Sequence, residues 1–250
     1  MVRKYTILHG IFEEKYIIDI LKKEIVKTRD GSNTIFVPEF DETYHSTHGA
    51  IQESLHVFIR SGLKFKTELN DINVLEVGFG TGLNALLSFI DSEETNRNIK
   101  YTSLEAYPLK WDLLSKLNYI DLIFNGKYSA TYKKMHTCDW ESFYILSPFF
   151  TLRKQNVKLQ DVLFDNEFDL IYFDAFAPRV QPELWTEEIF TSMYKALKPG
   201  GVLVTYCAKG SVKRALRHVG FELQSIPGPP GKREMSRAIK PSLNKYRCEV

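Results

Sequence analysis

Hydrophobic and polar positions alternate along this chain in a way that predicts strands and helices in turn. Short apolar runs predict strands at 73–77, 99–105, 149–153, 168–174 and 202–207. Amphipathic spacing and end signals predict helices at 82–90, from Pro108 onward and at 182–197. This β-α alternation predicts a doubly wound, mostly parallel α/β sheet, which binds its ligands at the carboxyl ends of the strands.

Two further regions flank this pattern. Before it, residues 23–37 predict a hairpin that turns at Asp30-Gly31, and residues 49–62 predict an amphipathic helix. After it come a predicted helix at 211–219, a strand at 221–226 and a Gly-Pro-Pro-Gly turn. We therefore divide the chain into an N-terminal extension with a β-hairpin (1–48) and a main domain (49–250). Residues 118–148 show no pattern that assigns their elements.

The predicted strand at 73–77 runs into a glycine loop. Glycines at 78, 80 and 82 let the backbone adopt positive φ and approach a ligand, and the N–H groups of the next helix stay free for an anion. A dinucleotide site needs G-x-G-x-x-G, and Leu83 stands where that pattern has its third glycine. The E-x-G-x-G-x-G spacing, which starts at Glu76, resembles motif I of the class I S-adenosylmethionine (SAM) methyltransferases. A purely structural strand-to-helix turn is the alternative.

Acidic residues end two other predicted strands. Glu105 follows the second strand, where a carboxylate can accept both ribose hydroxyls of a nucleoside cofactor. Asp174 follows the fourth strand, ahead of Phe176 and Pro178, as the polar anchor followed by a proline-stiffened aromatic loop does in methyltransferases that modify nitrogen. We expect Asp174 to orient an accepting amine and Phe176 to pack against a substrate base or the methyl donor. A loop cap is the alternative role for Asp174.

Composition restricts the class of protein. With 250 residues and 44% hydrophobic content, the chain suits one α/β domain with additions. It shows neither an apolar leader nor a run of membrane-spanning length, so we expect a cytoplasmic protein without membrane contact. Its cysteines, Cys138, Cys207 and Cys248, are far apart, and they predict neither a disulfide framework nor a metal site.

Charge is distributed unevenly around a net value of +2. Residues 209–250 contain ten Lys and Arg against three acidic residues, so the rest of the chain is mildly acidic. Lys209, Lys232 and Arg233 belong to this basic part, and the last two follow the rigid Gly-Pro-Pro-Gly turn. A nucleic-acid backbone is the partner that this pattern favours, and solvated surface lysines are the alternative.

Five motifs in unbroken order identify the chain as similar to the methyltransferase domain of the MnmC family. They are DETYHS at 41–46, VGFGTGLN at 77–84, EAYPL at 105–109, FDAFAP at 173–178 and GKREM at 231–235. The resemblance implies a Rossmann-like SAM-dependent enzyme that acts on tRNA and methylates the exocyclic primary amine of 5-aminomethyl-2-thiouridine at the wobble position. The expected SAM contacts are Tyr44, Ser46, Glu76, Gly78, Phe79, Gly80, Gly82, Asn84 and Glu105. The expected substrate contacts are Pro178, Lys209, Lys232 and Arg233, with Asp174 and Phe176 as catalytic residues.

Two departures from the family pattern add expectations. The chain shows no second glycine fingerprint and no length for an FAD-dependent oxidase domain, so we expect a stand-alone methyltransferase whose amine comes from a separate oxidase or aminomethyl-generating enzyme. Lys154-Gln155-Asn156 stands where the family has an acid that contacts the adenine, so Gln155 or Asn156 is expected there. Two other functions stay open: an aminopropyltransferase-like enzyme with a small amine substrate, and a non-catalytic tRNA-binding protein.

Overall fold

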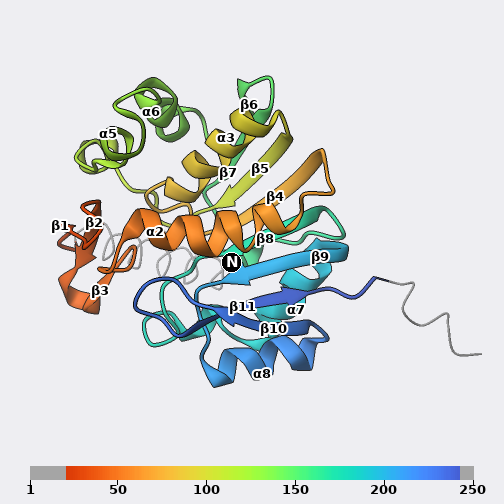
Figure 1. Cartoon of the computed structure of the whole chain (residues 1–250). Coiled ribbons are helices and arrows are strands. Elements are labelled where there is room, and N and C mark those ends of the chain that lie inside the picture. The colour runs from red at the N-terminus through yellow and green to blue at the C-terminus, as the bar shows by residue number, and fades with distance from the viewer. Residues whose placement is uncertain (1–20, 243–250) are drawn as a thin grey trace, which may run out of the picture.

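The computed structural model describes residues 21–242, and its centre is an eight-stranded sheet. The strands are β4 (Asp71–Val77), β5 (Asn98–Leu104), β6 (Phe143–Ser147), β7 (Phe150–Gln155), β8 (Phe168–Phe173), β9 (Leu197–Thr205), β10 (Glu222–Pro227) and β11 (Glu234–Ile239). Their order is β10-β11-β9-β8-β4-β5-β7-β6 (Figure 1). The five central strands, β9 to β7, are parallel, and antiparallel pairs close both sides of the sheet. The predicted fold class is confirmed.

Helices cover both faces of this sheet. The α-helices are α2 (Ala50–Ser54), α3 (Leu83–Thr95), α4 (Trp111–Leu114), α5 (Tyr119–Phe124), α6 (Ser129–Thr137), α7 (Glu187–Ala196) and α8 (Gly210–Val219). Neighbouring residues on β4 point to opposite faces, as the two-residue period of a strand requires. Val74 joins the core beneath α3, whereas Leu75 joins the core beneath α7 and α8. The sheet is therefore doubly wound.

A small second sheet lies beside the carboxyl ends of the parallel strands. It contains β1 (Glu24–Lys27), β2 (Asn33–Val37) and β3 (Glu42–Thr43), in that order and antiparallel. Figure 1 shows it at the left, on the side toward which the central strands run. His45, which follows β3, contacts the glycine loop, since its Nε2 lies 2.7 Å from Thr81 Oγ1. The predicted hairpin is confirmed, and it forms part of the surroundings of the site.

Several predicted boundaries are wrong, for local reasons. The helix expected from Pro108 begins at Trp111 and spans four residues, because Lys110 ahead of it has an extended backbone and residues 108–110 form no helical turn. The helix expected over 49–62 changes at Leu55 from α to π geometry (η2, Leu55–Arg60). The helix expected over 182–197 is a 3-10 turn (η5, Pro182–Leu184) followed by α7, whose Thr186 side chain accepts the Ile189 N–H. The remaining 3-10 turns are η1 (Pro38–Phe40), η3 (Leu63–Phe65) and η4 (Leu159–Asp161).

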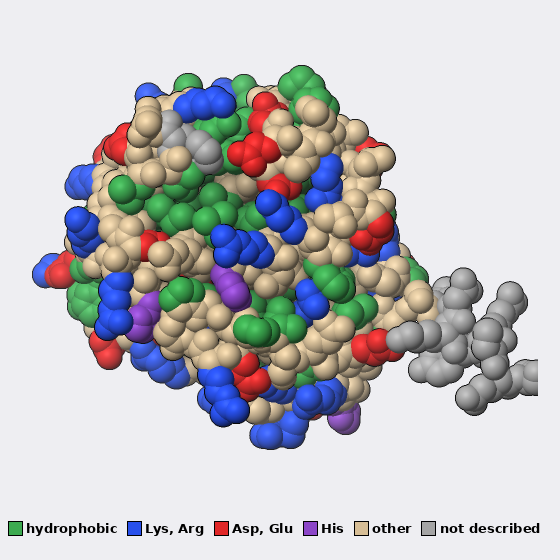
Figure 2. Space-filling view, in the orientation of Figure 1, with side chains coloured by type: hydrophobic (Ala, Val, Ile, Leu, Met, Phe, Trp, Pro, Cys, Tyr) green, Lys and Arg blue, Asp and Glu red, His purple; other side chains and the backbone are tan. Residues whose placement is uncertain are grey.

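Two other properties of the described part bear on function. Within residues 21–242, no helix combines the length and the apolar character that crossing a membrane requires. Lys and Arg side chains gather along the lower edge of Figure 2, over α8, which contains Lys213, Arg214 and Arg217. The predicted basic C-terminal part thus includes a helix that presents cations to solvent, and its last members, Lys245 and Arg247, lie outside the described residues.

Candidate active site

A cavity of about 1020 Å³ opens at the carboxyl edge of the central sheet. Three groups of residues after the central strands line it: the glycine loop after β4, Glu105 to Tyr107 after β5, and 157–160 after β7. The small sheet and the loop after β8, which includes Phe176 and Gln181, also line it. Parallel strands bring these loops together because all of their carboxyl ends meet at one edge.

The glycine loop needs glycine at its first and third positions. Gly78 has φ +91°, and a Cβ atom there would lie 2.8 Å from the backbone oxygen of Asp174. Gly82 has φ +70°, and a Cβ atom there would lie 2.7 Å from His136 Nε2. Both positions combine a left-handed backbone with close neighbours, so a side chain would displace the loop. The loop therefore presents bare backbone to the cavity.

Side chains from distant segments hold this loop in place. The Thr81 carbonyl oxygen accepts hydrogen bonds from the Tyr132 hydroxyl at 2.7 Å and from His136 Nε2 at 3.1 Å. Burial lowers the pKa of His136 to about 3, so its ring is neutral and its Nε2 carries the donated proton. Both side chains belong to α6, in the segment that the sequence pattern left unassigned. They support the loop and were missed because neither lies near it in sequence.

Glu105 occupies the position predicted for a ribose acceptor. Its carboxylate accepts the Gly80 N–H through Oε2 and the Tyr107 N–H through Oε1, each at 2.9 Å. Burial raises the pKa of Glu105, while these two N–H donors act in the opposite direction. Each carboxylate oxygen has capacity for a second donor. Glu105 is thus oriented by the backbone and faces the cavity ready to accept hydroxyl groups.

Asp174 lies at the same edge, one strand away from Glu105 across β4. Its backbone N–H donates to the Val77 carbonyl oxygen at 3.0 Å, and its Oδ2 accepts the Asn84 side-chain amide at 2.8 Å. Burial, and next the charge of Glu53, raise the pKa of Asp174 to about 7, against the Asn84 hydrogen bond and the Lys232 charge. The side chain bonds to Asn84 and lines the cavity, which leaves it available to a ligand.

An aromatic cluster forms the outer part of the cavity. The Phe176 ring meets Tyr44 edge-on at 5.0 Å and Phe40 at 6.3 Å between ring centroids. The loop that carries Phe176 is fixed by Trp185, whose indole N–H donates to the Phe176 carbonyl oxygen at 2.8 Å. The rings of Phe40, Tyr44 and Phe176 all line the cavity. Edge-to-face aromatic pairs of this kind form a rigid apolar surface against which a planar ring packs.

A partly buried ion pair completes the wall near Asp174. Lys232 Nζ donates to Glu53 Oε1 at 2.6 Å, and Glu53 Oε2 accepts the Ser46 N–H at 2.7 Å. Lys232 also lies over the Tyr206 ring, 4.0 Å from its centroid. Glu53 was not among the predicted site residues. Its partner is 179 positions away in the chain, so no local motif identifies the pair.

The remaining predicted site residues lie outside the cavity wall. Glu76 is fully buried beneath the loop, where the Ser103 hydroxyl donates to its Oε2 at 2.6 Å. Asn156 donates through its side-chain amide to the carbonyl oxygens of Glu105 and Ala106, so it supports the Glu105 segment. The others that do not line the cavity are Gly82, Gln155, Pro178, Lys209 and Arg233. The wall beyond β7 comes instead from Val157, Lys158, Leu159 and Gln160.

These residues fit SAM. Gly78 and Gly80 bring bare backbone to the cavity, in left-handed conformations that a side chain would strain, and Glu105 presents a half-buried carboxylate for the ribose. Asn84 lines the cavity, and its buried Oδ1 atom meets no hydrogen-bond partner within residues 21–242. Within residues 21–242, no group of three His, Cys, Asp or Glu side chains is arranged to hold a metal ion.

Comparison with known proteins agrees with this geometry. Residues 127–241 match a family model described as S-adenosyl-L-methionine-dependent methyltransferase. The tRNA 5-methylaminomethyl-2-thiouridine biosynthesis bifunctional protein MnmC of Actinobacillus pleuropneumoniae is 32% identical over 232 residues, which cover 85% of this chain and 34% of that protein. The MnmC protein of Idiomarina loihiensis is 30% identical over 214 residues, 78% of this chain and 35% of its own length. The chain spans about a third of the length of the curated relatives it matches.

Solved structures give the same result for the fold. MnmC2 from Aquifex aeolicus aligns with a TM-score of 0.73 at 25% identity, over 94% of this chain and 76% of its own. Spermidine synthase from Thermotoga maritima aligns with a TM-score of 0.52 at 18% identity, over 89% of this chain and 69% of its own. The second likeness concerns the fold alone.

Proposed function

This chain belongs to the S-adenosyl-L-methionine-dependent methyltransferases related to MnmC, and we propose that it methylates the primary amine of 5-aminomethyl-2-thiouridine at the tRNA wobble position. The observation that carries the proposal is the position of Asp174. It shares one cavity with the glycine loop and with the aromatic cluster of Phe40, Tyr44 and Phe176. A carboxylate between a cofactor cradle and an aromatic surface suits an amine attached to a planar base.

SAM supplies an electrophilic methyl group when it is bound. The glycine loop would hold its amino-acid end, with Asn84 Oδ1 accepting from the amino group. Glu105 would accept from the ribose hydroxyls while its own orientation is maintained by Gly80 and Tyr107. The residues at 157–160 would enclose the adenine, in place of the predicted Gln155 and Asn156.

Asp174 would hold the accepting amine. Its carboxylate accepts N–H donors, so it fixes the direction in which the nitrogen lone pair points, and orientation is the main requirement of a single displacement. Its neighbours restrict its motion, because Asn84 binds Oδ2 and the Val77 carbonyl binds the backbone N–H. Phe176 and Tyr44 would pack against the base and exclude water from the reacting atoms.

Transfer RNA is the proposed partner. The exposed cations of the C-terminal part, among them Lys209, Arg214, Arg217 and Arg233, would contact its phosphates. Lys232 is the exception among the predicted phosphate contacts, since it lies against Glu53 inside the cavity wall. A tRNA substrate would place the protein in the cytoplasm, and a separate enzyme would have to generate the aminomethyl group on the uridine.

The decisive experiment is methylation in vitro, followed by nucleoside mass spectrometry. The purified protein is incubated with SAM and with tRNA that carries 5-aminomethyl-2-thiouridine, and we expect a mass increase of one methyl group on that nucleoside. Unmodified tRNA and an Asp174→Ala variant are the controls. Putrescine with decarboxylated SAM tests the aminopropyl alternative. SAM binding without any methyl transfer to tRNA would refute the proposal and favour a non-catalytic tRNA-binding role.

A further inference from the structure

Lys232 and Arg233, which follow the Gly-Pro-Pro-Gly turn, have different surroundings. Arg233 is exposed and does not line the cavity. Lys232 lines it, with Nζ 2.6 Å from Glu53 Oε1 and 4.0 Å from the centroid of the Tyr206 ring. The face of an aromatic ring attracts a cation, so two contacts fix the Lys232 ammonium group. The position of Lys232 is therefore determined by the cavity wall.

Glu53 is equally constrained. It belongs to α2, its side chain is 9% exposed, and its second oxygen accepts the Ser46 N–H at 2.7 Å. The same wall continues to Asp174 through Tyr206, whose hydroxyl donates to the Ala175 carbonyl oxygen at 2.9 Å. Glu53, Lys232 and Asp174 all line the cavity. The structure thus assembles two carboxylates and one ammonium group around the place proposed for the amine.

The charge balance of this group decides the state of an amine placed beside it. A primary amine is mostly protonated near neutral pH, and an ammonium nitrogen has no lone pair with which to attack. Opposite charges within about 4–6 Å stabilise the protonated form and raise an amine's pKa. Two uncompensated carboxylates would therefore hold the substrate as an unreactive ammonium ion. With Lys232 bound to Glu53, one of these charges is offset in part.

We propose that the Glu53–Lys232 pair sets the protonation state of the accepting amine: Lys232 offsets the charge of Glu53, so that the amine beside Asp174 meets less negative charge and reacts in its neutral form. This proposal rests on the proposed function and deepens it. The nitrogen lone pair forms the new bond to the methyl carbon as the C–S bond breaks, and the bonding electrons go to sulfur. The methylated ammonium product then releases a proton to the Asp174 carboxylate or to solvent.

The charged and titratable groups around Lys232 are consistent with this arrangement. Burial lowers the pKa of His45 to about 4, so that ring is neutral. Glu234, the nearest acid along the chain, is 2.8 Å from Lys213 and engaged there. The other charged or titratable groups around this part of the wall are His48 beside Gly231, Tyr206 and Cys207 after β9, Lys209 and Lys213, whose charges act on Cys207, and the carboxylates of Asp30, Glu42, Glu53 and Asp174. Burial and the Glu53 charge raise the pKa of Asp174 to about 7, which makes it a proton acceptor suited to neutral pH.

The test is the pH profile of single-turnover tRNA methylation. Lys232→Met keeps the length of the side chain and removes the charge, so the rising limb of the profile should move to higher pH by about one unit or more. The rate near pH 7 should then fall about tenfold for each unit. The double variant Glu53→Gln, Lys232→Met removes both charges and should return the limb toward the wild-type position. Lys232→Arg should stay close to wild type.

A second measurement does not depend on turnover. Calorimetry in two buffers of different ionisation enthalpy counts the protons released when an anticodon stem-loop with the aminomethyl group binds the protein without SAM. Wild type should release more protons near pH 7 than Lys232→Met does. Arg233→Met is the matched control, and it should reduce RNA affinity and the salt dependence of binding while leaving the pH profile in place.

The outcomes separate the two proposals. A wild-type enzyme that methylates the amine, with a Lys232→Met profile that does not move, overturns the charge-balance role and keeps the function. A profile that moves equally in the single and double variants also overturns it, because loss of packing then explains the shift. If Lys232→Met behaves like Arg233→Met, Lys232 is a phosphate contact. Failure of the wild type to methylate the amine overturns both proposals.

Discussion

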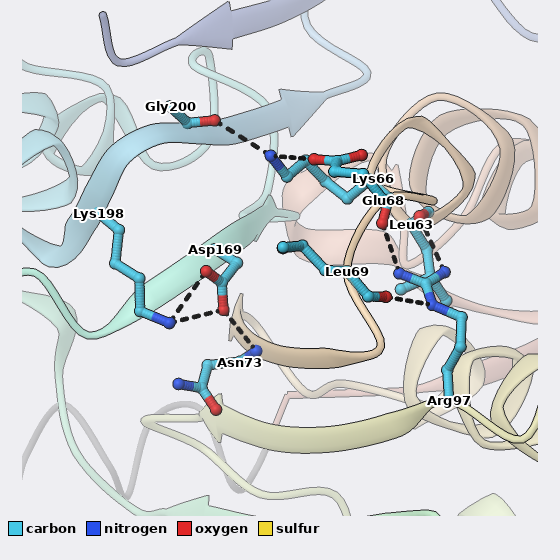
Figure 3. Close-up of polar contacts among 9 residues, drawn as sticks. All are labelled: Leu63, Lys66, Glu68, Leu69, Asn73, Arg97, Asp169, Lys198 and Gly200. Carbon is cyan, nitrogen blue, oxygen red and sulfur yellow. Dashed lines mark hydrogen bonds and ion pairs between the residues drawn. The ribbon is translucent and has the colours of Figure 1, made fainter. Parts of the chain in front are cut away.

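The two edges of the central sheet use polar residues in opposite ways. At the amino edge, Figure 3 shows a network in which each drawn cation is matched by acceptors. Arg97, only 8% exposed, donates to the carbonyl oxygens of Leu69 at 3.0 Å, Leu63 at 3.3 Å and Lys66 at 2.6 Å. This one side chain thereby ties the loop ahead of β4 to the end of α3.

A second contact at that edge joins three strands. Asp169 of β8 accepts the Lys198 ammonium group at 2.8 and 2.9 Å and the Asn73 backbone N–H at 2.8 Å (Figure 3). Lys66 adds a bond to the Gly200 carbonyl oxygen at 3.3 Å and an ion pair with Glu68 at 2.7 Å. These groups satisfy one another, so their effect is to hold the sheet and its loops together.

At the carboxyl edge, buried polar atoms are left over. Within the described chain, Glu76 Oε1 and Asn84 Oδ1 meet no hydrogen-bond partner. Burial raises the pKa of Glu76 to about 8 and that of Asp174 to about 7. Buried unsatisfied groups with shifted pKa values are costly for folding, and their presence beside a cavity marks a candidate ligand site. The comparison teaches that the polar side chains of Figure 3 bind one another and hold the sheet, whereas Glu105 and Asp174 line a cavity with acceptor capacity left for a ligand.

The largest expected effect is on turnover at the carboxyl edge. Asp174→Ala removes the group that orients the amine, and single-turnover methylation should fall by about 100-fold or more, the range of a lost positioned acid or base. Affinity for S-adenosylhomocysteine, measured by calorimetry, and the thermal midpoint should stay close to wild type. A normal methylation rate on pre-bound tRNA would show that Asp174 is only a loop cap, and the carboxyl edge would then not differ from the amino edge at this residue.

The next effect is on stability at the amino edge. Arg97→Met leaves three carbonyl oxygens without their donor, and each buried loss costs roughly 1–3 kcal/mol, so the unfolding free energy should fall by about 3 kcal/mol or more. Urea denaturation measures it. Lys198→Met is the control at the same edge: its side chain is 38% exposed, and a partly exposed ion pair contributes at most about 1 kcal/mol. Equal losses in the two variants would contradict the network's assigned role.

Glu105→Ala should separate binding from stability. It removes a carboxylate that would accept from ribose, which costs about 1.5–3 kcal/mol in SAM affinity, or roughly 10- to 100-fold. The unfolding free energy should fall by less than in Arg97→Met, because the Gly80 and Tyr107 N–H groups that lose their acceptor lie at the cavity and gain access to water. Isothermal calorimetry supplies the affinity. Unchanged SAM binding would mean that the cofactor lies elsewhere.

Sequence patterns predicted the parts of the molecule that depend on local periodicity. Buried strands appear in the sequence as apolar runs, and the loops that follow parallel strands lie at one edge of the sheet. Gly78, Glu105 and Asp174 follow three such strands, and all three line the same cavity, as expected. The segment 118–148 was not assigned because its helices bury few residues; in α6 these are Tyr132 and Met135. The Glu53–Lys232 pair depends on how α2 meets the turn after β10, which no local spacing encodes.

The smallest effect concerns Glu76, which is fully buried at the carboxyl edge. Its folded pKa of about 8 lies above the ordinary glutamate value of 4.5, so between these values the folded state binds a proton that the unfolded state has released. Stability therefore falls as pH rises from about 4.5 to 8. Glu76→Gln cannot ionise, so its unfolding free energy should match wild type near pH 5 and exceed it by at least about 1 kcal/mol at pH 8. Urea midpoints at both pH values measure this, with Asp169→Asn as the amino-edge control, which should lose stability at pH 8 because the Lys198 pair is broken. A Glu76→Gln variant that is destabilised equally at both pH values would show that the carboxylate is a satisfied structural group, and the contrast between the two edges would then rest on Asp174 and Glu105 alone.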